Sequence, residues 1–197
     1  MNSFWNERFA VKEYVYGTEP NQFYKEELEK LKPGKILFPA EGEGRNAVFA
    51  AILGWDVTAF DSSIEGKKKA EKLANTRGIN IQYFINNYEN IQFEPESFDC
   101  LVLIYAHMHP LKRNEYHKKL TSFLKPGGKL ILEGFSKDQI NNSTGGPRDI
   151  NMLFSEQELR NDFENLTHLS IEEADIILKE GQFHDGEASV IRVVGTR

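Results

Sequence analysis

The chain has 197 residues, 40% of them hydrophobic, which is enough to bury a sizeable core and makes one domain the default expectation. Its formal net charge of −6 opposes binding to nucleic acid or to an anionic membrane surface, so a small-molecule partner is favoured. The one cysteine, Cys100, excludes an internal disulfide, and its place in the apolar stretch 98–104 predicts an inert buried thiol.

The first residues lack a basic stretch followed by an apolar one, and no apolar run approaches the length that spans a membrane. We therefore expect a cytoplasmic protein. Residues 1–32 carry a cluster of aromatic side chains, and Thr18 or Asn21 is a candidate cap for a helix that runs to Leu31, before Pro33 and Gly34. This N-terminal arm either packs on the core or forms a lid over a ligand, and both interpretations stay open.

The next stretch, from Pro33 to Asp61, has the pattern of a strand, a glycine loop, a helix and a second strand that ends in an acid. Gly42 and Gly44 allow the backbone to approach a ligand closely, the helix that follows offers unpaired N–H groups, and Asp61 can accept the hydroxyls of a ribose. This unit predicts a nucleotide-binding function.

Further units of strand and helix follow along the chain. Ser62 or Ser63 can cap a lysine-rich helix that ends at Gly78, with Glu65 and Lys69 spaced as an ion pair. Alternation predicts a strand over 79–85, and a continuous apolar run predicts a buried strand over 98–104.

The last part of the chain begins with a predicted basic helix over 111–124. A strand is expected over 129–135, followed by a polar, glycine-rich loop over 136–151 that is long enough to suggest function. A capping box at Ser155 and Glu158 predicts a helix to Phe163, and strands over 169–178 and 188–194 form an expected closing hairpin.

Two kinds of nucleotide fit the glycine loop. The spacing Gly42-x-Gly44-x-x-Ala47, with Asp61 placed 19 residues after Gly42, is typical of a nicotinamide-dependent oxidoreductase. Three wider features favour S-adenosylmethionine (SAM) instead: five successive strands with helices between them, the turn at 124–128, and the closing hairpin.

With these features, the chain resembles the class I SAM-dependent methyltransferases. It is similar to the small-molecule branch that includes tellurite-resistance and thiopurine methyltransferases. The resemblance covers nearly the whole chain, and its most specific pieces are Trp5 with 8–9, then 14–21, 42–46, 124–128 and 144–147. It implies an α/β fold, Rossmann-like and doubly wound, in which a mainly parallel seven-stranded sheet with an antiparallel last strand lies between helical layers. It also implies one domain over 1–197, with an N-terminal arm or lid and helix over 1–32 and the core over 33–197.

The sequence departs from this family at two positions of the glycine loop. Phe38 stands where the family has an acid that holds the amino group of SAM, and Ala40 stands where it has a glycine. Glu41 is a candidate replacement for the acid. A non-catalytic SAM-binding protein is therefore a third hypothesis, beside the methyltransferase and the oxidoreductase.

The resemblance implies SAM as cofactor and a set of residues that contact it, from the glycine loop and the ends of the strands. These are Ala40, Glu41, Gly42, Gly44, Arg45, Asn46, Asp61, Ser62, Asn87, Tyr88 and Ala106.

The sulfonium of SAM already activates its methyl group, so positioning matters most, and a soft nucleophile needs no strong base. His107, His184 and Arg148 are candidate catalytic residues, since they suit an anionic or metalloid acceptor. Trp5, Tyr14 and Tyr16 are candidate substrate or lid residues. No third ligand accompanies His107 and His109, so no metal is expected.

Overall fold

The structure is a computed structural model of the chain and describes residues 2–197, with side chains from Phe4 onward. Its residues form two compact units, 1–92 with 180–183, and 93–179 with 184–197. The expected division into an arm over 1–32 and a core over 33–197 stays a prediction.

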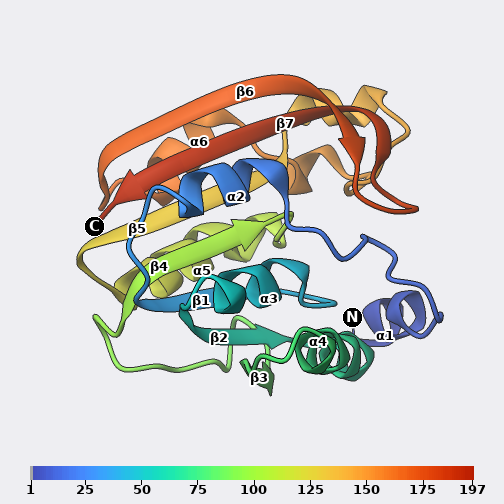
Figure 1. Cartoon of the computed structure of the whole chain (residues 1–197). Coiled ribbons are helices and arrows are strands. Elements are labelled where there is room, and N and C mark those ends of the chain that lie inside the picture. Colours follow the sequence, from blue (N-terminus) through green and yellow to red (C-terminus); the bar gives the residue numbers. More distant parts are fainter. Residues whose placement is uncertain (1) are drawn as a thin grey trace. The chain divides into compact units, whose positions relative to one another are not determined.

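The seven strands have the order β3-β2-β1-β4-β5-β7-β6, which confirms the predicted Rossmann-like fold with a mainly parallel sheet and an antiparallel closing strand. The first unit holds β1 to β3, paired in parallel, and the second holds β4 to β7, with β7 antiparallel to both of its neighbours (Figure 1). Among residues 2–197, no helix has the length and apolar character needed to cross a membrane.

The elements of the first unit follow the predicted order from residue 22 onward, whereas the helix over 2–9 was not predicted. They are α1 (Asn2–Phe9), α2 (Gln22–Leu28), β1 (Lys35–Pro39), α3 (Arg45–Ile52), β2 (Asp56–Asp61), α4 (Ile64–Thr76) and β3 (Gln82–Ile85).

Local sequence signals account for the starts of two helices in this unit. The Asn21 side chain accepts a hydrogen bond from the Tyr24 N–H and begins α2, and Ser63 does the same for the Gly66 N–H at the start of α4. The buried Tyr24 ring packs edge-on against Phe38 of β1 at 5.7 Å. Phe38 is therefore a core residue under α2, which gives a physical reason for an aromatic side chain at this position.

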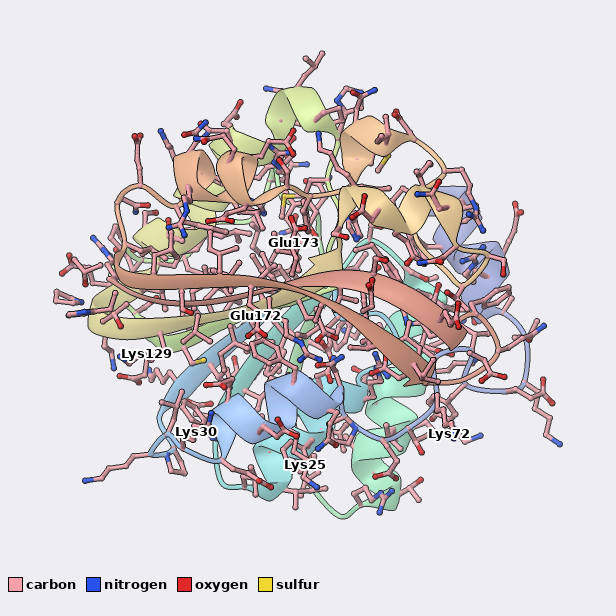
Figure 2. All side chains as sticks on the ribbon, turned by 90° about the horizontal axis from the view of Figure 1, so that it is seen from above. Lys25, Lys30, Lys72, Lys129, Glu172 and Glu173 are labelled. Carbon is pink, nitrogen blue, oxygen red and sulfur yellow. The ribbon has the colours of Figure 1, made fainter. Side chains whose placement is uncertain are left out.

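Two predictions in this unit are wrong. The strand β3 is shorter than expected, because Ile79 and Ile81 pack from the preceding loop onto the cluster around Leu73. Glu65 pairs with Lys68 instead of Lys69, since Lys69 is drawn to Glu43 at 2.7 Å. The rest of the lysine-rich face is more open, and Lys72 lies exposed on α4 (Figure 2).

The second unit contains β4 (Phe98–Ile104), α5 (Pro110–Ser122), β5 (Leu124–Phe135), η1 (Lys137–Asn141), η2 (Ile150–Met152), α6 (Glu156–Asp162), β6 (Thr167–Lys179) and β7 (Asp185–Thr196).

Most boundaries in this unit follow the prediction, and the capping box that starts α6 is present. Helix α5 ends at Ser122, earlier than expected, because Leu124 already pairs with Phe98 as part of β5. The long polar segment after β5 contains two short 3-10 helices that the sequence did not indicate. Cys100 is buried, as predicted, and burial raises the pKa of its thiol.

Candidate functional site: the glycine loop and the strand ends

The glycine loop between β1 and α3 has three residues in the left-handed backbone region. Ala40, Gly42 and Gly44 have φ values of 53°, 62° and 89°. The Gly42 N–H donates to Oδ2 of Asp61 at 3.0 Å, which ties the loop to the carboxyl end of β2. The loop therefore holds a fixed shape, and a side chain at position 40 adopts a conformation that favours glycine.

The glycine loop and helix α4 approach each other closely at two glycines, Gly44 in the loop and Gly66 on the helix. A Cβ on Gly44 would lie 2.5 Å from Cβ of Ala70, and a Cβ on Gly66 would lie 2.8 Å from the Gly42 carbonyl oxygen. Gly44 and Gly66 therefore permit a close approach of helix and loop. The predicted close approach of Gly42 and Gly44 to a ligand stays a prediction.

Glu41 lies in the glycine loop, and its side chain reaches the first turn of α3. Its Oε1 accepts hydrogen bonds from the backbone N–H groups of Asn46 and Ala47, at 2.9 and 2.7 Å. Burial raises the pKa of Glu41 from 4.5 to about 7, and the nearby charge of Asp61 adds to this shift. Two acids thus lie close together at the ends of adjacent strands.

Asp61 ends β2 and is 8% exposed. Its Oδ1 accepts from the Ser63 N–H at 2.8 Å while Oδ2 accepts from Gly42, and burial raises its pKa. Among residues 2–197, neither Asp61 nor Glu41 forms an ion pair. Asp61 is buried and Glu41 is half-buried, and neither carboxylate has an ion-pair partner in the described part of the chain, so a ligand with a cationic group and hydroxyl donors would be stabilised here.

The third strand supplies a residue that the sequence did not single out. The Tyr83 hydroxyl donates to the Gly42 carbonyl oxygen at 2.7 Å, and this side chain is buried under the loop. Of the predicted residues after this strand, the Tyr88 ring packs against Phe60 at 6.0 Å. Asn87 is exposed, and its side chain accepts from the Asn90 N–H in a turn. Ser62 lies half-buried between Asp61 and the helix cap Ser63.

Arg45 and Asn46, both predicted to bind cofactor, are engaged by the N-terminal segment. The Arg45 guanidinium pairs with Glu180 at 2.7 Å and donates to the Tyr16 carbonyl oxygen at 3.1 Å. The Asn46 side chain accepts from the Asn21 N–H at 2.9 Å. These side chains fasten residues 16–21 to the start of α3.

The candidate lid residues lie on the same side of the loop. The Tyr16 N–H donates to Glu43 at 3.3 Å, and the Tyr14 hydroxyl donates to the Lys69 carbonyl oxygen at 3.0 Å. Trp5 stacks on Phe9 at 5.4 Å. The N-terminal segment therefore covers the glycine loop in this structure, which is compatible with either interpretation of the arm.

The second unit brings together His107, His184 and three aromatic side chains, and the ring of Phe135 contacts both histidines. His107 stacks on Phe154 at 4.4 Å, and His184 meets Tyr105 edge-on at 4.5 Å. The Phe135 N–H donates to Nε2 of His107 at 3.0 Å, so Nδ1 carries the proton and donates to the Met152 carbonyl oxygen at 2.8 Å. Both ring nitrogens are occupied, and burial lowers the pKa of His107 to about 4.

Tyr105 is a further residue that the sequence did not single out. It follows β4 with a φ of 52°, and its hydroxyl donates to Oε1 of Glu133 at 2.9 Å. Glu133 is 1% exposed and its other oxygen accepts from Nε of Arg192 at 2.7 Å. Tyr105 thus has a left-handed backbone conformation, and its side chain is fixed by the ion pair of Glu133 and Arg192. Strained residues of this kind are common at functional sites.

Three other residues named from the sequence are Ala106, Arg148 and His109. Ala106 is buried next to Tyr105. Arg148 is exposed and donates to the carbonyl oxygens of Asn142 and Ser143, so it orders its own loop. His109 begins α5, where its ring accepts from the Leu111 N–H at 3.3 Å.

Comparison with known proteins supports the resemblance seen in the sequence. Residues 36–128 match a family model described as a methyltransferase domain. The ubiquinone/menaquinone biosynthesis C-methyltransferase UbiE of Geotalea daltonii is 30% identical over 136 residues, which cover 66% of this chain and 51% of that protein. UbiE of Haemophilus ducreyi is 32% identical over 111 residues, 54% of this chain and 43% of that protein. The chain thus spans about half the length of these relatives.

Solved structures share the fold. TehB from Haemophilus influenzae has a TM-score of 0.70 and 15% identity, covering 100% of this chain and 66% of TehB. The N-methyltransferase NodS from Bradyrhizobium japonicum has a TM-score of 0.67 and 16% identity, and the match covers 100% of this chain and 97% of NodS. A protein studied for the conversion of a disulfide into a thioacetal during echinomycin biosynthesis has a TM-score of 0.79 and 20% identity. The match covers 100% of this chain and 91% of that protein.

Proposed function

We propose that this chain is a class I SAM-dependent methyltransferase that acts on a small-molecule acceptor. The observation that carries the proposal is the pair of carboxylates formed by half-buried Glu41 and buried Asp61. They form no ion pair among the described residues, and they follow or end the adjacent parallel strands β1 and β2. The matched methyltransferase domain, residues 36–128, contains both.

The groups of this site fit the cofactor. Asp61 keeps two oxygens fixed by backbone N–H groups, with lone pairs left for ribose hydroxyls. Oε1 of Glu41 accepts hydrogen bonds from the first turn of α3, which leaves Oε2 to bind an ammonium group. Glu41 therefore takes the role of the acid that the family has at the position of Phe38, whose ring lies in the core against Tyr24.

Bound SAM supplies an activated methyl group, so the protein has to bind, orient and exclude water. In the second unit, His184 and Tyr105 belong to an aromatic cluster in which the Tyr105 hydroxyl is fixed by its hydrogen bond to Glu133. His107, His184 and Arg148 stay candidate catalytic residues. The engaged nitrogens of His107 favour an acceptor whose nucleophile needs no base, such as a thiol, as in the thiopurine branch.

Calorimetric titration with S-adenosylhomocysteine tests the cofactor assignment. We expect binding to the wild type, and Asp61→Asn should weaken it at least tenfold because one oxygen that accepts a ribose hydroxyl becomes an amide donor. Asp56→Asn is the matched control, since Asp56 is the exposed aspartate at the opposite end of β2. Absence of binding to the wild type would refute the proposal.

Two alternatives have their own outcomes. Fluorescence enhancement of NADH on mixing would favour the nicotinamide-dependent oxidoreductase that the Gly42-x-Gly44 spacing also suggests. Binding of S-adenosylhomocysteine without methyl transfer to any member of a thiol, halide and metalloid panel would favour a non-catalytic SAM-binding protein. The cytoplasmic location and the absence of a nucleic-acid partner remain predictions from composition.

A further inference from the structure

Arg8 on α1 lies among three aromatic rings from two separate parts of the first unit. Its guanidinium carbon is 4.7 Å from the centre of the Phe4 ring, 5.7 Å from that of Trp5 and 4.3 Å from that of Phe183. Its Nη1 donates to the Tyr16 hydroxyl at 3.0 Å. The guanidinium is therefore held in place by rings on its faces and by one hydrogen bond at its edge.

The charge of Arg8 has no carboxylate partner among residues 2–197. The other arginines whose side chains are mostly buried do have one: Arg45 pairs with Glu180, and Arg113 pairs with Asp162. The chain has 30 acidic residues against 24 basic ones, so acids are plentiful and the missing partner is notable. Nε and Nη2 of Arg8 are left as donors with the planar geometry that suits an oxyanion.

The aromatic cluster joins Arg8 to the glycine loop. Trp5 stacks on Phe9, and the Phe9 ring lies 3.1 Å from the place where a Cβ on Gly42 would be. Phe9 is 3% exposed, whereas Phe4 is 51% exposed, so the cluster runs from the buried loop to the surface. Among the described residues, Arg8 has no hydrogen bond to the glycine loop, and the hydrogen bond that it donates goes to Tyr16, which favours an anion carried by the acceptor over the carboxylate of the cofactor.

We propose that Arg8 and the rings of Trp5 and Phe183 form the subsite that binds the methyl acceptor, and that the acceptor is a small aromatic or apolar molecule carrying a carboxylate. The rings bind its apolar body, and Nε and Nη2 of Arg8 bind its anion. This inference rests on the proposed function, because that function supplies the need for an acceptor subsite beside the cofactor loop.

Ligand binding tests the subsite without relying on methyl transfer. Trp5 is one of two tryptophans, so Trp55→Phe makes it the only tryptophan, and selective excitation of tryptophan then reports on the surroundings of Arg8. We would titrate this protein with benzoate and with benzyl alcohol, with and without saturating S-adenosylhomocysteine. Benzoate is expected to change Trp5 fluorescence saturably and to bind at least tenfold more tightly than benzyl alcohol.

Arg8→Gln should reduce benzoate affinity at least tenfold and leave that of benzyl alcohol unchanged, and Arg8→Lys should have an intermediate effect because it keeps the charge but loses the planar donors. Arg77→Gln, at an exposed arginine of the same unit, is the matched control. Circular dichroism and thermal unfolding of each variant separate loss of the subsite from loss of α1.

Equal binding of benzoate and benzyl alcohol, or no effect of Arg8→Gln on benzoate, would overturn the inference. A loss of S-adenosylhomocysteine affinity in Arg8→Gln with unchanged benzoate binding would also overturn it, since Arg8 would then hold the cofactor's carboxylate. If the wild type fails to bind S-adenosylhomocysteine, the proposed function fails, while the benzoate titration in its absence still reports on Arg8.

Discussion

Replacing Glu41 by glutamine separates the charge of this side chain from its hydrogen bonds. The amide oxygen of glutamine can still accept from the N–H groups of Asn46 and Ala47, so the start of α3 stays capped. Only the negative charge is lost. If this charge serves the cofactor, the variant should be more stable and should bind S-adenosylhomocysteine more weakly.

The raised pKa of Glu41 sets the size of the stability effect. Each pKa unit corresponds to about 1.4 kcal/mol, and burial raises this pKa from 4.5 to about 7. The folded chain holds the proton more tightly than the unfolded chain, so ionisation begins to destabilise the fold above pH 4.5, and the full cost of about 3 kcal/mol is present above pH 7. The stability gain of Glu41→Gln should therefore be about 2 kcal/mol larger at pH 8 than at pH 5.

Urea unfolding at the two pH values measures this difference, and Glu94→Gln, at an exposed glutamate, is the control. Calorimetry measures the other half of the expectation. Wild-type affinity for S-adenosylhomocysteine should rise between pH 6 and pH 8, with release of a proton near pH 7, and Glu41→Gln should bind at least tenfold more weakly, with no such rise. Wild-type affinity in the variant, or an equal stability gain at both pH values, would refute the reasoning.

Three further predictions concern the backbone of the loop and the buried histidine. Ala40→Gly should raise the unfolding free energy by about 0.5 to 1 kcal/mol in urea unfolding, because the φ of 53° strains alanine; a loss of stability would contradict this. Gly44 and Gly54 share a φ of 89°, but only Gly44 faces a close neighbour, Ala70. Alanine at position 54 should therefore cost about 1 kcal/mol, and at position 44 about 1 to 3 kcal/mol more, in the same assay; equal losses would show that crowding is irrelevant. The pKa of His107 is lowered from 6.5 to about 4, so its contribution to stability is complete above pH 6.5 and falls by about 3 kcal/mol as pH drops to 4. His107→Gln should show a correspondingly smaller loss of stability between pH 7 and pH 4, and an unchanged pH dependence would count against a neutral buried ring.

The sequence predicted those parts of the fold that depend on short-range signals. Asn21 and Ser63 cap their helices, because a cap needs only a side chain and the next three residues. The alternation of strands and helices likewise follows from hydrophobic periodicity over short windows. The order of elements and the place of the glycine loop were therefore available before the structure.

The parts that could not be predicted depend on residues far apart in the sequence. Spacing favoured Lys69 as a partner of Glu65, but Glu43 lies closer in the fold. The contact of Tyr83 with Gly42 has no local signature, since the two residues are 41 positions apart. For the candidate site, the position of Asp61 at the end of a predicted strand indicated its role. The burial and the neighbouring groups that raise the pKa of Glu41 could not be predicted from the sequence.

The ion pair of Arg45 with Glu180 bears on how the chain is made. Arg45 lies in the first quarter of the chain, and its partner belongs to the connector 180–183 between β6 and β7. During synthesis this arginine has no such partner until residue 180 has left the ribosome, and burying its charge alone would cost about 3 to 5 kcal/mol. We expect the first unit to mature only after residue 180 emerges, and a fragment that ends at residue 92 to leave the start of α3 and residues 16–21 open to proteolysis.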